Sequence, residues 1–312
     1  MKNKKRVAIY YDNSFGRNDG PPLYYFEALK RFKELEVMHL IPEGDTRRFG
    51  KFDYHFWVDW GEDGLPWTHW QIPDDGGKKI YVCSDAHFGA EYRYNKAKEF
   101  DHVFFNQKYY VNEYVKFLNR PAGFDATQFI DYLPHAAEPK AYPKFSIIKK
   151  YDICFIGHIQ EEHKGNGVNV TRLDALDHMF KAFPNFYYGS RNPAFPDKNI
   201  FDDAAKKFCL SRIVFNISAG NDLNMRFFEA LMTGSFLLTN KIPELKNAEA
   251  YGFIDGVHYV SYVSLDDAVK KAQYYLEHED EREKIAKAGY KQALISGTYK
   301  SRIEEIFSKI NS

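Results

Sequence analysis

The stretch of sequence that decides the fold is NISAGNDLNMRFFEALMTGSFLLTN, Asn216 to Asn240. It continues an apolar run, SRIVF, whose length is typical of a buried strand. A polar loop containing one glycine follows, and then a helix that begins near Leu223 to Met225 and leads into a second apolar strand. The unpaired N–H groups and the positive dipole end of such a helix suit an anion. Arg226 adds a positive charge in the first turn, and Glu229 lies about one turn further on.

This strand–loop–helix therefore fits a nucleotide diphosphate with a ribose beside it. The same spacing fits a plain crossover helix that binds nothing, because a glycine-poor loop before a helix is a weak motif.

The remainder of the chain alternates strands and helices in the same way, which predicts an α/β protein with parallel sheets. Apolar runs of strand length cover residues 7–11, 37–41, 52–60, 79–87, 102–107, 151–157, 185–190, 211–218, 235–240 and 258–264. Helical patterns cover residues 23–35, 109–117, 171–183, 202–210, 223–234, 264–289 and 298–310.

The alternation breaks once, at a segment with the composition of a connector. Residues 139–150, PKAYPKFSIIKK, contain two prolines and four lysines. We therefore expect a first domain over residues 1–139, a linker over 140–150 and a second domain over 151–295. A final helix over residues 296–312 is expected to pack back on the first domain.

Composition narrows the class of protein. The chain has 312 residues, enough for two domains, and its 43 basic and 43 acidic residues give a net charge of zero. That balance argues against a surface built wholly for nucleic acid. No apolar run is long enough to span a membrane, and no signal peptide is recognisable. Three widely spaced cysteines fit a reducing compartment, so we expect a cytoplasmic protein.

The segment around Arg226 resembles the donor-binding region of GT-B glycosyltransferases, which are related to glycosyltransferase family 4 (group 1). It resembles most narrowly the spore-maturation-protein (CgeB-like) group. The matching residues are Asp222, Leu223, Asn224, Met225, Arg226, Phe228, Glu229, Ala230, Leu231, Gly234, Leu237, Leu238 and Thr239. The resemblance continues from Gly252 to Ile303 and includes YDICFIGH, residues 151–158. It implies a GT-B fold, in which two Rossmann-like domains face each other across a cleft.

The resemblance also implies roles for individual residues. Glu229 would hold the donor ribose, and Asn224, Met225 and Arg226 would form the helix start that faces the diphosphate. The other residues that it places near the donor are Gly157, Arg172, Gly189, Arg191 and Asp222.

One position departs from the pattern of the related retaining enzymes. Those enzymes carry a second Glu eight residues before the ribose-binding one, where this chain has Asn221. Inversion and retention therefore both stay open.

Metal chemistry is not expected. His158 and His163 lie near two glutamates, but their spacing is not that of a His-Glu-x-x-His zinc motif. The resemblance likewise implies catalysis without a metal or other cofactor, in which an arginine and a helix dipole stabilise the leaving diphosphate.

Candidates for the catalytic base follow the strand KIYVC. Asp85 and His87 lie where a parallel strand ends, and either could accept a proton from an acceptor hydroxyl. A helix cap at Ser84 or Asp85 is the structural alternative. Asp12, Gly16 and His135 are further candidates for the acceptor side or the cleft.

All four tryptophans lie close together, in the segment HFWVDWGEDGLPWTHW. They are Trp57, Trp60, Trp67 and Trp70. The cluster fits either a stacking platform for the acceptor or a local core.

The sequence thus predicts a glycosyltransferase of the hexosyltransferase type that uses a UDP- or GDP-linked sugar. Its acceptor is open: a glycan, a protein, a small molecule or modified phage DNA. Two alternatives remain, a nucleotide-sugar epimerase of the same fold and a binding protein with a decayed site.

Overall fold

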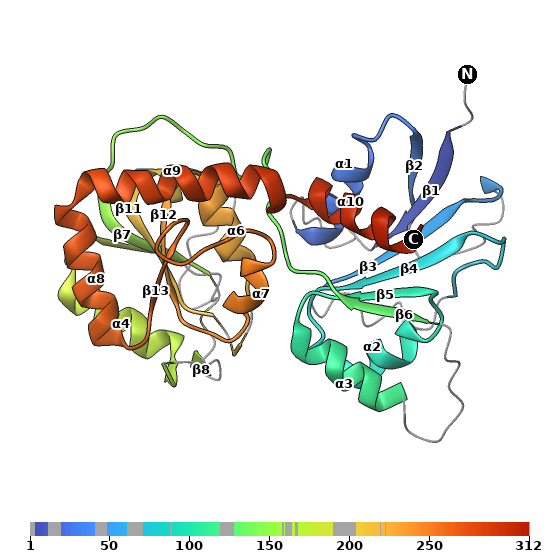
Figure 1. The fold of residues 1–312 in the computed structure, drawn as a ribbon, viewed down its shortest axis with the longest axis horizontal. Coiled ribbons are helices and arrows are strands. Elements are labelled where there is room, and N and C mark those ends of the chain that lie inside the picture. Colours follow the sequence, from blue (N-terminus) through green and yellow to red (C-terminus); the bar gives the residue numbers. More distant parts are fainter. Residues whose placement is uncertain are drawn as a thin grey trace. The chain divides into compact units, whose positions relative to one another are not determined.

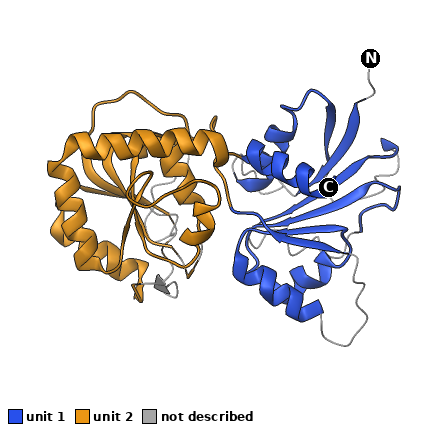
Figure 2. Ribbon diagram, in the orientation of Figure 1, with its two compact units in different colours: residues 1–134, 299–312 blue, residues 135–298 orange. Residues whose placement is uncertain are grey.

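A computed structural model describes residues 4–11, 20–40, 49–60, 71–87, 89–118, 128–157, 159, 164–165, 168–189, 204–218, 220–221 and 223–311. The chain divides into two compact units, coloured separately in Figure 2. Unit 1 comprises residues 1–134 and 299–312, and unit 2 comprises residues 135–298.

Unit 1 is a parallel sheet with helices (Figure 1). Its strands are β1 Lys5–Tyr10, β2 Leu35–Leu40, β3 Tyr54–Asp59, β4 Lys78–Cys83, β5 His102–Phe105 and β6 Phe129–Tyr132, in the order β2-β1-β3-β4-β5-β6. Its helices are α1 Pro21–Leu29, α2 Ala90–Ala97, α3 Lys108–Leu118 and α10 Tyr299–Ile310. The four or more consecutive buried residues in β1, β3 and β4 are those expected of strands covered on both faces.

The first helix is shorter than its pattern predicts. The helix expected over residues 23–35 ends at Leu29, and turns follow at Arg31 and Phe32. The reason is tertiary: Leu35 pairs with Lys5 in the sheet, so it cannot also continue the helix. Leu35 fits the helical spacing of apolar residues, but in the structure it is the first residue of β2.

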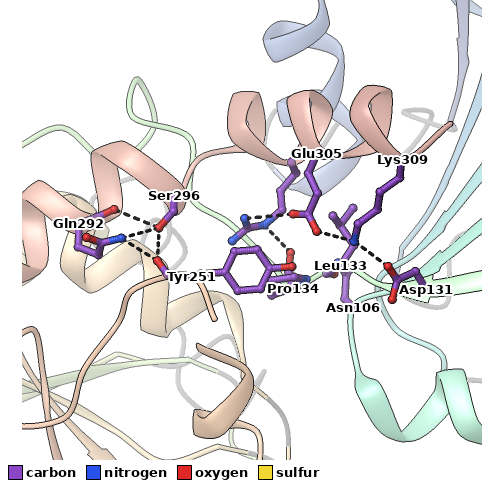
Figure 3. A network of polar contacts seen from close by, with 10 residues as sticks. Asn106, Asp131, Leu133, Pro134, Tyr251, Gln292, Ser296, Glu305 and Lys309 are labelled. Atoms are coloured by element: carbon purple, nitrogen blue, oxygen red, sulfur yellow. Dashed lines mark hydrogen bonds and ion pairs between the residues drawn. The ribbon is translucent and has the colours of Figure 1, made fainter. Parts of the chain in front are cut away.

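The C-terminal helix α10 is part of unit 1. Its Phe307 ring packs edge-on against Tyr54 and Phe56 of β3, at centroid distances of 5.1 and 5.9 Å. The buried Arg302 donates from Nε to the Pro134 carbonyl at 2.9 Å, at the point where the chain leaves the unit. Lys309 pairs with Asp131 of β6 at 2.7 Å (Figure 3). Apolar packing and ionic contacts together hold the last segment of the chain to the first domain.

Unit 2 is built on the same plan. Its sheet contains β7 Tyr151–Ile156, β10 Phe186–Gly189, β11 Ser211–Asn216, β12 Phe236–Asn240 and β13 Val260–Tyr262, all parallel and ordered β10-β7-β11-β12-β13. Its helices are α4 Arg172–Ala182, α5 Ala204–Leu210, α6 Met225–Met232, α7 Leu245–Glu249, α8 Leu265–Glu277 and α9 Glu279–Ser296. A short antiparallel pair, β8 Lys164–Gly165 and β9 Val170–Thr171, precedes α4.

The long helix expected over residues 264–289 is two helices. The chain breaks at His278, whose backbone is not helical, and α9 then runs on to Ser296. The break lets Arg282 turn inward, where it is buried and donates to the Tyr275 carbonyl at 2.7 Å. Arg282, which lies in a run of charged residues in the sequence, is therefore part of the packed interior.

Among the helices in the described part of the chain, none has both the length and the apolar composition that crossing a bilayer requires.

Candidate functional site

The candidate site lies in unit 2, at the carboxyl edge of its sheet. Strands β7, β10 and β11 are parallel, so their carboxyl ends meet at one edge. The Gly157 N–H, just after β7, donates to the carbonyl of Gly189 at the end of β10, at 3.0 Å. Helix α6 begins shortly after β11, so its amino-terminal end follows the same edge.

Arg226 is the central residue of this edge. It lies in the first turn of α6 and is only 8% exposed. Its Nε donates to the Ile156 carbonyl, its Nη1 donates to Asn216 Oδ1 at 2.7 Å, and its guanidinium lies 4.2 Å from the centre of the Phe155 ring. Among the described residues Arg226 has no carboxylate at ion-pair distance, so a buried cation is held by neutral groups.

Gly157 makes room for this guanidinium. A Cβ at Gly157 would lie 1.6 Å from Arg226 Nη2 and 2.7 Å from its Cζ. No side chain fits there, because ordinary van der Waals contact begins at about 3.4 Å. The third guanidinium nitrogen is therefore directed at bare backbone at the end of β7.

The electrostatics of the site are positive. Burial, together with the nearby charge of Arg172, lowers the pKa of the Arg226 guanidinium to about 9, and Glu229 opposes the shift. Arg226 thus stays protonated at neutral pH. Arg172 is itself 7% exposed and donates from Nε to the Ile217 carbonyl at 3.0 Å, just beyond β11.

The start of α6 is capped by Asn224. Its side-chain oxygen accepts from the Phe227 N–H at 3.2 Å, which satisfies one of the orphan donors of the first turn. Met225 and Glu229 are both half-buried and lie four residues apart, which places them on one face of the helix. The sequence pattern placed the helix start between Leu223 and Met225 and its end at Gly234; α6 begins at Met225, the last residue of that range, and ends at Met232.

Asn216 was not among the residues that the sequence suggested. It ends β11, is 1% exposed, and exchanges hydrogen bonds with the Asn224 side chain at 3.1 and 3.2 Å. Its Nδ2 also donates to Thr239 Oγ1 at 3.0 Å. The sequence signal that could have indicated Asn216 is its position, since it is a polar residue at the end of an apolar strand.

The expected base residues lie at the corresponding edge of unit 1. Asp85 follows β4 and is half-buried, and His87 is exposed. The Asp85 carbonyl accepts from the fully buried Arg93, whose Nε is 3.1 Å from a carboxylate oxygen of the buried Asp59. Burial raises the pKa of Asp59, although Arg93 opposes the shift. This ion pair has no clear signal in the sequence, because Asp59 there looks like an ordinary polar residue at the end of a strand.

Other expected residues are placed as follows. His135 is buried at the start of unit 2. Trp57 is 3% exposed and stacks with Tyr10, so it belongs to the core, while Trp60 is half-buried and lies against Gly20. Asp12, Gly16, Trp67, Trp70, His158, His163, Arg191 and Asp222 lie outside the described residues.

No group of metal-ligating side chains was found among the residues that the structure describes. The three cysteines are buried and unpaired with one another.

Comparison with known proteins adds to this geometry. Residues 173–308 match the model of a family described as glycosyl transferase-like. That region contains α6 and the end of β11, and thus most of the site. None of the curated proteins that were compared matches the chain.

Solved structures show the fold of the whole chain. Sucrose-phosphate synthase from Thermosynechococcus elongatus is similar with a TM-score of 0.66 at 10% identity, covering 99% of this chain and 98% of that one. HepE from Anabaena in complex with UDP and glucose is similar with a TM-score of 0.64 at 12% identity, covering 99% and 100%. A glycosyltransferase from Rickettsia africae gives 0.57 at 11% identity, covering 99% and 98%. The chain has the GT-B fold of two Rossmann-like domains, as the sequence predicted.

Proposed function

We propose that this protein is a glycosyltransferase that moves a sugar from a nucleotide-sugar donor to an acceptor hydroxyl. The observation that carries the proposal is the buried Arg226 guanidinium at the carboxyl edge of the unit 2 sheet. A buried cation that has no carboxylate at ion-pair distance among the described residues is costly, and an anionic ligand would offset that cost. The diphosphate of a nucleotide sugar is such a ligand.

The donor site would use the groups around Arg226. The start of α6 would face the diphosphate, with Arg172 adding positive charge. Gly157 would leave room for the Arg226 guanidinium, and Gly189 would let the ligand approach the backbone. Glu229, half-buried one turn into α6, would accept hydrogen bonds from the ribose hydroxyls.

The chemistry proposed for this site needs no metal. As the bond between sugar and diphosphate breaks, negative charge grows on the leaving phosphate. Arg226 and the amino end of α6 are already oriented by hydrogen bonds to Ile156 and Asn216, so they would stabilise that charge without rearranging. On the acceptor side we propose Asp85 and His87 as candidate bases.

The donor is proposed to be linked to UDP or GDP. HepE, whose structure contains UDP and glucose, supports testing UDP and UDP-glucose first. The sugar is proposed to be a hexose, and the acceptor is open among a glycan, a protein, a small molecule and modified phage DNA.

Calorimetric titration of the purified chain tests the donor site. UDP, GDP, ADP, CMP and dTDP would each be titrated with and without EDTA. We expect one diphosphate to bind in both conditions. Arg226→Ala and Glu229→Ala should each weaken that binding about ten- to a hundredfold, the effect of losing a charge-assisted hydrogen bond. Parent-like affinity in both variants would place the donor elsewhere.

Product analysis separates the rival activities. A transferase releases nucleotide in step with the glycosylation of an added acceptor. An epimerase of the same fold changes the sugar of the nucleotide sugar with no acceptor present. A binding protein leaves the nucleotide sugar intact in either mixture.

A further inference from the structure

We propose that Asn216 is a positioning residue for the diphosphate site, and that its being an amide rather than a carboxylate keeps the charge of Arg226 available to the ligand. This inference rests on the function proposed above, and it concerns how the site is built.

The first argument is the saturation of the Asn216 side chain. Its Oδ1 accepts from Arg226 Nη1 at 2.7 Å and from Asn224 Nδ2 at 3.1 Å. Its Nδ2 donates to Asn224 Oδ1 at 3.2 Å and to Thr239 Oγ1 at 3.0 Å. An amide offers two donors and two acceptor lone pairs, so every hydrogen-bonding capacity of this one is used.

The second argument is what those bonds connect. Asn216 ends β11, Thr239 lies in the neighbouring β12, and Asn224 is the cap of α6. One buried side chain thus fixes both the cap that orients the first-turn N–H groups and the guanidinium behind them. The Asn216 backbone is held as well, because its carbonyl accepts from the Tyr262 hydroxyl at 2.9 Å.

The third argument concerns charge. A carboxylate in place of the amide would accept from Arg226 at the same position and form a buried ion pair, and it would lose the two hydrogen bonds that Nδ2 donates to Asn224 and Thr239. The pair would satisfy Arg226 within the protein and reduce the positive field that a diphosphate needs. An amide orients the guanidinium without adding a negative charge, so that among the described residues only the more distant Glu229 carboxylate acts on Arg226.

The test compares two variants that add the same charge to unit 2. Asn216→Asp adds it beside Arg226. Asn185→Asp adds it on the exposed residue just before β10, at the amino edge of the same sheet, and serves as the matched control. The full chain and both variants would be titrated with inorganic pyrophosphate, UDP, GDP, uridine and guanosine at constant ionic strength.

We expect Asn216→Asp to weaken pyrophosphate and the preferred nucleotide about ten- to a hundredfold. Binding of the matching nucleoside should change by less than about twofold, and Asn185→Asp should behave as the parent. Asn216→Ser, which removes the bond to Arg226 without adding charge, should give an intermediate loss. It also keeps the test decisive if thermal unfolding shows that Asn216→Asp does not fold.

Three results would overturn the inference, and they differ from one another. Equal loss of nucleoside and pyrophosphate binding in Asn216→Asp would mean that Asn216 only maintains the fold. Unchanged pyrophosphate binding in a folded Asn216→Asp would refute the charge argument and leave the donor site standing. A parent that binds none of the five probes would overturn the proposed function itself.

Discussion

Gly157→Ala is the sharpest perturbation of the site, because the structure fixes its consequence. The new Cβ would lie 1.6 Å from Arg226 Nη2, so the guanidinium must withdraw by about 1.8 Å to reach ordinary contact. A shift of that size breaks its 2.7 Å bond to Asn216 and its bond to the Ile156 carbonyl. Each hydrogen bond to a charged group contributes about 1.5–3 kcal/mol.

Two measurements follow from this displacement. Chemical denaturation should show a free energy of unfolding lower by about 2–4 kcal/mol, since the guanidinium regains only part of its bonding elsewhere. Calorimetry should show nucleotide diphosphate affinity lower by about ten- to a hundredfold. The backbone at Gly157 is not in the left-handed region, so conformational strain does not contribute.

A double-mutant cycle supplies the control. Arg226→Lys removes the atoms that the new methyl group would strike, so Gly157→Ala should cost much less in that background. A single Gly157→Ala variant with parent-like stability and affinity would refute the packing argument. Equal costs in both backgrounds would mean that the methyl group strikes something other than Arg226.

Other parts of the structure lead to further expectations. Arg93→Met should lower the free energy of unfolding by about 3–5 kcal/mol in urea denaturation, because it leaves the buried Asp59 carboxylate without its cationic partner. A loss of less than about 1 kcal/mol would contradict this expectation. Arg302→Met should loosen the contact of α10 with Pro134, seen as faster amide exchange along that helix relative to α9. Burial lowers the pKa of His258, whose Nδ1 accepts from the Ile254 N–H. The unfolded chain therefore binds this proton more readily, and the free energy of unfolding should fall as pH drops below about 6.5. His258→Asn should reduce that fall, and a parent equally stable at pH 7.5 and 5.5 would argue against it.

The sequence predicted most elements because local pattern and burial agree in them. The apolar runs at residues 151–157 and 211–218 contain β7 and β11, and α6 begins directly after the capping residue Asn224, within the predicted range Leu223 to Met225. Prediction failed at the end of α1 and at the break after α8. In both places the apolar spacing continues, and a long-range strand pairing or an inward arginine decides where the helix stops.

The site was predicted in part for a related reason. Arg226 was a candidate from the strand–loop–helix motif and Gly157 from the family resemblance. Neither signal predicts their mutual fit, since the two residues lie far apart in the chain and meet only at the sheet edge. Asn216 and the Asp59–Arg93 pair were missed because a single polar residue at a strand end carries no local signal of its partners.

The sequence by itself determined the fold class, two α/β halves, and the presence of a helix start with an arginine in its first turn. Periodicity and capping are local properties, so they can be read along the chain. Only the tertiary structure decided what that arginine does. It is buried against Phe155, bonded to Ile156 and Asn216, and given room by Gly157. The free energy of a buried charge depends on the groups around it, and parallel strand order rather than chain position brings those groups together.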